Sequence, residues 1–284
     1  MNLKDILVFL DAGAASEGRL KLATNIARAH RAHLDAAFLP PGETADFLPG
    51  IGTRPFGLGG SLPDLGTAEI PRNAMLADVA EDRFRDLLRS FGIEGKWYPL
   101  DRKDTAEFAA LAQAVDLIIL GQIDPDARPA PALRPEKIVV ACGRPALMVP
   151  YVGSFAQVGR RVLIAWDGSR EAVRALNDAL PLIGNAEEVT VMTVRARERD
   201  FERDRPSMER ILRHLALHGV VARSVQTPHG GNTVSDVLLS GAVDIAADLI
   251  VAGAFHHSQM REALIGGVSR GLFQHMTVPV LMSH

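Results

Sequence analysis

A chain of 284 residues is long enough for one large domain or two ordinary ones, and a hydrophobic content of 47% is enough to build buried cores. The net charge of −3 gives no reason to expect nucleic acid as a partner. The single cysteine, Cys142, excludes an intramolecular disulfide, and no hydrophobic run approaches the roughly 18 residues that span a bilayer, so no membrane partner is expected.

The first predicted strand runs from Ile6 to Leu10 and ends at Asp11, and a turn of small residues and a helix follow it. Because the amino terminus reads as a strand and not as a signal peptide, we expect a cytoplasmic location. Residues 40–72 are rich in Gly and Pro and lack both helical and strand periodicity, which predicts a long surface loop. Further strands are expected at residues 116–121 and within residues 144–150.

The second half alternates hydrophobic strands with helices that have one hydrophobic face. We expect strands at 162–166, 189–194, 222–226, 249–252 and 278–282, and helices near 170–182, 206–218, 233–246 and from 266 to about 276. Strands that are hydrophobic along almost their whole length, separated by helices, indicate a parallel sheet covered on both faces.

Three landmarks recur in the same order in the two halves, which indicates a duplicated domain. A strand ending in aspartate occurs at Asp11 and at Asp167, and the strand 116–121 matches the strand 248–253. The ending Pro-Ala-Leu-Met-Val matches Pro-Val-Leu-Met-Ser. We therefore predict an α/β fold with two doubly wound, five-stranded parallel-sheet domains of flavodoxin-like order, at residues 1–152 and 158–284.

The end of the chain is the candidate ligand site. A strand stops at Gly253, and Gly266-Gly267-Val268-Ser269 then opens a helix, where backbone N–H groups and the helix dipole favour an anion such as phosphate. Ligands of such sheets bind beyond the carboxyl ends of the strands. If the strands that end at Asp167 and Gly253 are neighbours, both face one crevice. The alternative is that Asp167-Gly168-Ser169 only makes a turn and caps a helix.

These features resemble the universal stress protein family, whose nucleotide pattern is Gly-x2-Gly-x9-Gly-(Ser/Thr) after a first strand that ends in aspartate. Gly253 and Gly266 match two of the glycines, whereas His256 and Gly267 depart from the pattern. The resemblance implies that the ligand is an adenine nucleotide, ATP above all. It leaves open whether Mg²⁺ binds with the nucleotide. It implies contacts from Asp167, Ser169, Val194, Gly253, His256, Gly266, Gly267, Val268 and Ser269. It also implies that the two halves pack as a pseudo-dimer with two-fold symmetry, and it leaves a further homodimer open.

The first domain keeps Asp11 and Gly121, but the segment after Gly121 is rich in proline and no glycine opens the helix that follows it. Prolines remove the N–H donors that a phosphate needs. We therefore expect the first domain to have a structural or interaction role and to bind no nucleotide.

The function that we expect is a stress-response module that binds ATP in the second domain and couples to unidentified protein partners through the loop 254–265. An efficient ATPase is not expected, because the second domain contains no lysine and no Walker A loop. One alternative is an interaction or scaffold protein that binds no nucleotide. Another is a metal-assisted hydrolase that uses the loop histidines His229, His256 and His257. For these three histidines, a role as ordinary polar loop residues is more expected than a role as metal ligands.

Overall fold

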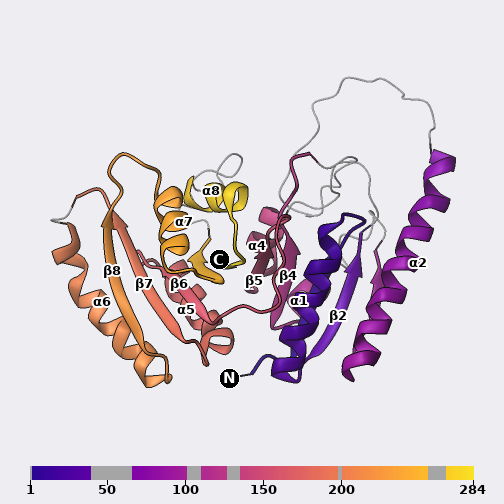
Figure 1. Ribbon diagram of the computed structural model, residues 1–284, viewed down its shortest axis with the longest axis horizontal. Helices are drawn as coiled ribbons and strands as arrows, with labels where there is room; N and C mark the ends of the chain where they lie inside the picture. The colour runs from indigo at the N-terminus through magenta and orange to yellow at the C-terminus, as the bar shows by residue number, and fades with distance from the viewer. Residues whose placement is uncertain (1, 40–65, 101–109, 127–134, 198–199, 255–266) are drawn as a thin grey trace.

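The computed structural model describes residues 2–39, 66–100, 110–126, 135–197, 200–254 and 267–284. These residues form a ten-stranded sheet with helices on its faces (Figure 1). The strand order is β3-β2-β1-β4-β5-β10-β9-β6-β7-β8, so the second half of the chain repeats the order of the first half in reverse. The prediction of an α/β fold built from two five-strand, doubly wound units is confirmed.

In the first half the elements are β1 (Asp5–Leu10), α1 (Ala15–His30), β2 (His33–Phe38), α2 (Gly66–Phe91), β3 (Trp97–Pro99), β4 (Leu117–Gly121), α4 (Pro135–Cys142) and β5 (Ala146–Val149). In the second half they are β6 (Arg161–Ala165), α5 (Arg170–Ile183), β7 (Glu188–Arg195), α6 (Asp200–Leu217), β8 (Ala222–Pro228), α7 (Val234–Asp244), β9 (Leu249–Gly253), α8 (Gly267–His275) and β10 (Val280–Ser283).

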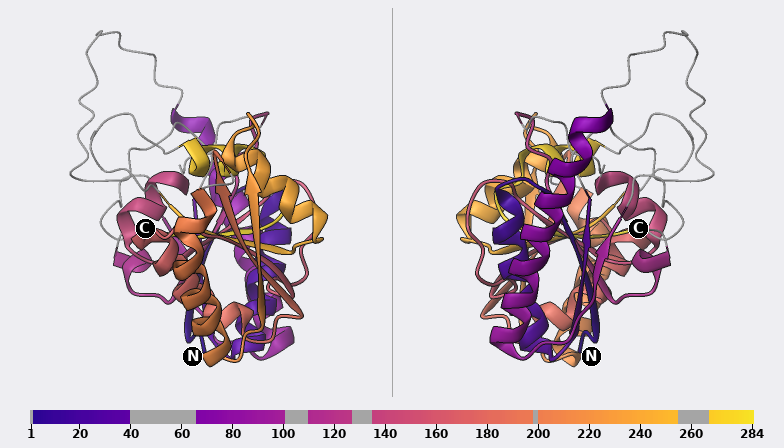
Figure 2. Two further views of the ribbon diagram at one scale, coloured as in Figure 1. Left: turned by 90° about the vertical axis from the view of Figure 1, so that its left-hand side faces the viewer. Right: turned by 90° about the vertical axis from the view of Figure 1, so that its right-hand side faces the viewer.

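The two halves meet through their last strands. Within each half all strand pairs are parallel, whereas β5 and β10 pair antiparallel, with Leu147 opposite Leu281. The two halves of the predicted pseudo-dimer therefore share one continuous sheet. An antiparallel centre has a further consequence, because it places the carboxyl edge of the first half beside the amino edge of the second. The sheet is also twisted, so that strands of the two halves cross when viewed along it (Figure 2).

Two hydrophobic layers hold the helices onto the sheet. One layer combines alternate strand residues such as Ile6 and Val8 with side chains of α1, α2, α5 and α6. The other combines the intervening residues, such as Leu7 and Phe9, with side chains of α4, α7 and α8. This alternation follows from the two-residue period of a strand, and it explains why the strands are hydrophobic along their whole length.

Two helices begin earlier than the sequence predicts. Residues 66–72 belong to α2, so the prediction of a continuous loop over 40–72 is wrong there, and residues 40–65 lie outside the described part. Likewise α6 begins at Asp200, within a charged stretch before the expected start near residue 206. In both cases an amphipathic helix extends toward its amino end, because each added residue gains a hydrogen bond without a new nucleation cost. Within the described residues no helix is long and hydrophobic enough to cross a membrane.

Candidate functional site

A cavity of about 270 Å³ opens at the carboxyl ends of β6, β7 and β9, beside the first turns of α5 and α8. β6 pairs with β9 and with β7, so the strand-end residues 167 and 253 come to the same edge of the sheet, as predicted. The predicted residues that line this cavity are Asp167, Ser169, Val194, Gly253, Gly267, Val268 and Ser269. The other two predicted site residues, His256 and Gly266, lie outside the described part of the chain.

The turn after β6 is held by its own side chains. Gly168 adopts a positive φ of 80°, which lets the chain reverse, and the Ser169 N–H donates to Asp167 Oδ1 at 2.9 Å. Ser169 Oγ in turn accepts from the Ala172 N–H at 3.1 Å and caps α5. The turn-and-cap interpretation of these residues is therefore correct. This turn still leaves Asp167 exposed at the cavity, so its carboxylate remains within reach of a ligand.

Another part of the cavity wall is the amino end of α8. In the first turn of a helix the N–H groups have no carbonyl partner within the helix, and the helix dipole gives this end a partial positive charge. Gly267 is exposed, and a Cβ built on it would meet no atom within 4 Å. The backbone at the start of α8 is thus open to an approaching anion. Ser269, two residues further, is buried in the same wall.

Gly253 has a steric role that the sequence pattern does not reveal. A Cβ at this position would lie 2.6 Å from the Ala172 nitrogen and 2.6 Å from the Glu171 carbonyl carbon, both in the backbone of α5. Those distances are far inside van der Waals contact, so only glycine lets the first turn of α5 pack this closely on the end of β9. Glycine at this position is therefore required for the packing of α5 on β9, whether or not a ligand binds.

Arg195 is a cavity residue that the sequence reasoning missed. Its guanidinium donates from Nη2 to the carbonyl oxygen of Asp167 at 3.1 Å and from Nη1 to that of Val194 at 3.4 Å. Arg195 follows Val194 at the carboxyl end of β7. The predicted strand 189–194 could therefore have indicated that Arg195 lies at the same edge of the sheet as Asp167. The remaining wall is mainly hydrophobic and includes Trp166, Met192 and Leu238. The cavity thus joins a hydrophobic wall to a carboxylate, a guanidinium and a helix amino end.

Residues 159–284 match the family model described as the universal stress protein family. The second half belongs to the universal stress protein family. The resemblance inferred from its strand-end aspartate and glycines is therefore confirmed. No curated protein matches the chain.

Solved universal stress proteins also share the two-half architecture. A universal stress protein from Archaeoglobus fulgidus DSM 4304 matches 99% of this chain over 96% of its own, with a TM-score of 0.72 at 15% sequence identity. A putative universal stress protein from Pseudomonas aeruginosa UCBPP-PA14 matches 99% of this chain over 93% of its own, with a TM-score of 0.60 at 17% identity. At these identities the likeness establishes the fold. A shorter family protein from Arabidopsis thaliana, solved with AMP bound, covers 43% of this chain over 90% of its own, at 18% identity and a TM-score of 0.33.

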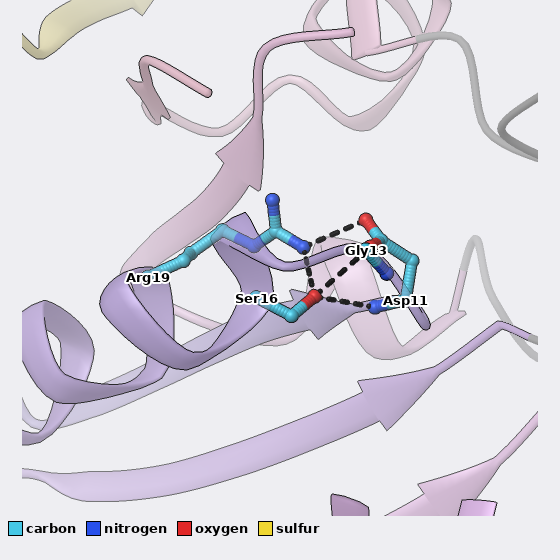
Figure 3. A network of polar contacts seen from close by, with 4 residues as sticks. All are labelled: Asp11, Gly13, Ser16 and Arg19. Carbon is cyan, nitrogen blue, oxygen red and sulfur yellow. Dashed lines mark hydrogen bonds and ion pairs between the residues drawn. The ribbon is translucent and has the colours of Figure 1, made fainter. Parts of the chain in front are cut away.

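The corresponding place in the first half of the chain is filled by an arginine. Arg19 is 3% exposed, and its Nη2 donates to Asp11 Oδ2 at 2.8 Å and to Ser16 Oγ at 2.7 Å (Figure 3). Its Nη1 lies 1.6 Å from where a Cβ on Gly121 would stand. The guanidinium therefore lies between the ends of β1 and β4. In the sequence, Ala175 follows Asp167 at the spacing at which Arg19 follows Asp11.

The Asp11 carboxylate is committed to this network. Its Oδ1 accepts from the Gly13 N–H at 2.7 Å and from the Ser16 hydroxyl at 3.0 Å (Figure 3). Burial raises the pKa of Asp11, but the Arg19 guanidinium and these hydrogen bonds outweigh it and hold the pKa below its ordinary value. The first half thus uses its strand-end aspartate for an internal ion pair, whereas Asp167 in the second half is exposed.

The histidines of the described residues do not gather into a metal site. His214 and His218 lie on one face of α6 with ring centroids 4.6 Å apart, and His214 Nε2 is 3.3 Å from the Asn177 side-chain oxygen. Within the described residues there is no group of three or more potential protein ligands for a metal. His229 follows β8 and lines a different hollow, beside α7. His256 and His257 fall outside the described ranges.

Proposed function

We propose that the second half of this universal stress protein binds an adenine nucleotide, with ATP as the expected ligand, and acts as a stress-response binding module. The observation that carries the proposal is that unlike groups line one cavity. An exposed carboxylate, Asp167, and the amino end of α8 are both part of its lining. A nucleotide has the complementary pair, because its ribose and base donate hydrogen bonds and its phosphates accept them.

The lining supports this orientation of the ligand. The hydrophobic residues Trp166, Met192 and Leu238 suit the flat face of a purine, and Val194 lines the same cavity. In this arrangement Asp167 accepts from a ribose hydroxyl or the base amine, and the N–H groups of residues 267–269 hold phosphate. Arg195 adds a fixed positive charge at the same edge, which favours an anionic ligand.

Magnesium would be held mainly by the phosphates. Asp167 is the one carboxylate among the described residues that line the cavity. Mg²⁺ in nucleotide sites commonly takes one or two carboxylates together with phosphate oxygens and water. The residues present therefore fit an ion that arrives with ATP, and do not form a separate metal cage.

Gly267→Asp tests the phosphate end of the site. Because a Cβ at Gly267 meets nothing within 4 Å, the carboxylate fits without a clash, and an acidic residue at a helix amino end is itself favourable to folding. We expect the Kd for ATP to rise about tenfold or more, since the new negative charge competes with phosphate at the same N–H groups. Binding is followed through the fluorescence of Trp166 in a Trp97→Phe background.

Gly267→Ser is the matched control for this experiment. It adds a side chain of similar size without charge, so its Kd should stay within about threefold of the unmodified chain. If both variants bind ATP like the unmodified chain, phosphate does not lie at α8. If the unmodified chain shows no saturable binding of ATP, the proposed function is wrong.

A further inference from the structure

Gln122 joins the two halves at the far end of the helix that forms the cavity wall. This buried residue follows β4 in the first half, and its Nε2 donates to the carbonyl oxygens of Phe273 at 2.9 Å and Gln274 at 3.2 Å. Both carbonyls belong to the last turn of α8, where helix carbonyls have no partner within the helix. A side chain from the first half therefore caps a helix of the second half.

The topology explains how Gln122 reaches this helix. α8 follows β9 and returns to the start of β10, so its amino end faces the cavity and its carboxyl end lies near the amino edge of the second half. Because β5 and β10 pair antiparallel, the carboxyl edge of the first half lies next to that amino edge. Gln122, the residue after β4, therefore lies next to the last turn of α8.

Gln122 is itself rigidly held. Its N–H donates to the Val149 carbonyl at 2.8 Å, and its Oε1 accepts from the Tyr151 N–H at 3.3 Å. Its backbone and both ends of its amide are thus engaged, with the donor end directed at α8. The equivalent residue after β9 is Ala254, which has no side chain that could cap α4 in return. The residue after β9 therefore does not repeat the contact that Gln122 makes, and the second half instead reaches the end of α4 through Arg174 of α5, which donates to the Gly143 carbonyl.

We infer that Gln122 is a positioning residue through which the first half fixes α8 and thereby the wall of the cavity that faces an anion. α8 has nine residues and is tied on its other side to α7, where Gly271 packs closely against Ser235. A helix this short has little stability of its own and depends on its neighbours for its place. Loss of the Gln122 contact should loosen α8 while the strands keep their pairing. The part of this inference that concerns ligand affinity rests on the proposed nucleotide function.

Two substitutions at Gln122 test the inference in the full chain. Gln122→Met has a similar length but no hydrogen-bonding amide, so it removes both contacts. Gln122→Glu keeps an acceptor for the Tyr151 N–H but replaces the donor with a carboxylate oxygen, which opposes the negative end of the α8 dipole. Asn25→Ala is the matched control, since Asn25 Nδ2 donates to the Ala156 carbonyl at 2.8 Å and so ties α1 to the connection between the halves without touching α8.

Amide hydrogen exchange without nucleotide is the first measurement. We expect exchange in α8 to become about tenfold faster in Gln122→Met and Gln122→Glu, with α1 and α5 unchanged and Asn25→Ala like the unmodified chain. Unchanged α8 exchange in folded variants overturns the inference, and so does equal acceleration in every helix, which would show a general loss of stability. If neither variant folds, Gln122→Asn serves instead, because its amide is one methylene too short to span both carbonyls.

ATP affinity is the second measurement, and it separates the two proposals. We expect the Kd for ATP to rise about tenfold in both Gln122 variants and to stay unchanged in Asn25→Ala. Faster α8 exchange with an unaltered Kd would overturn the link between Gln122 and the cavity. If the unmodified chain binds no ATP, the nucleotide function fails, and the exchange data alone decide whether Gln122 positions α8.

Discussion

Gly253→Ala is expected to lower the free energy of unfolding by about 2–3 kcal/mol, although it adds a single methyl group. The added carbon would lie 2.6 Å from two backbone atoms of α5, and neither can move without shifting the helix. The first turn of α5 would have to leave the end of β9, and the cavity would change shape with it. Urea unfolding at equilibrium, followed by circular dichroism, measures this loss.

Gly267→Ala makes the same chemical change at the glycine that opens α8 and serves as the control. Its added carbon meets no atom within 4 Å, and Ala is a better helix former than Gly. Its stability should therefore equal or slightly exceed that of the unmodified chain. If the two alanine variants are equally stable, close packing of α5 on β9 is not what requires glycine at 253.

Asp11→Asn is expected to cost about 2 kcal/mol of unfolding free energy at pH 7, because it leaves the Arg19 guanidinium buried without its carboxylate. The loss of a fully buried partner would cost about 3–5 kcal/mol, and the smaller figure allows for solvent screening of the Asp11 side chain, which is 43% exposed. Gly121 leaves the space that the guanidinium fills, so the guanidinium stays beside the substituted side chain. Urea unfolding of the two proteins measures the difference.

The pH dependence of this difference has a definite sign. The pKa of Asp11 is lower in the folded chain than its ordinary value of 3.8, so its ion pair stabilises the fold above that value. The stabilisation is lost as the pH falls below 3.8 and through the folded pKa. The gap between the two proteins should therefore be constant from pH 7 to pH 5 and should shrink below about pH 4. A gap that grows as the pH falls would contradict the assignment of the ion pair.

The strand order, and the meeting of two strand ends at the candidate site, could be predicted from the sequence. Hydrophobic runs that end in Asp11 and Asp167 mark the first strand of each half, and glycine marks the end of each fourth strand. Parallel strands that alternate with helices bring such ends to one edge of the sheet, which is why Asp167 and Gly253 were expected together. The resemblance to the universal stress protein family also implied a pseudo-two-fold arrangement, which the β5–β10 pair provides.

Other features depend on tertiary packing, which local patterns do not carry. Arg19 reads as one more charged helix residue, and only the fold shows that its guanidinium lies against Gly121. Gln122 lies at the end of a strand, and its contacts with α8 are 151 and 152 residues away in the chain. The early start of α2 was missed because its first residues lack amphipathic periodicity. Such residues gain their roles from neighbours that are distant in sequence.

Isothermal titration of the full chain with ATP tests the central claim most directly, because it counts sites as well as measuring affinity. The filled site around Arg19 and the open cavity beside Asp167 predict one nucleotide per chain, and Gly267→Asp should abolish or greatly weaken that binding. Binding of two nucleotides per chain, binding that Gly267→Asp leaves intact, or no heat of binding at all would contradict the account.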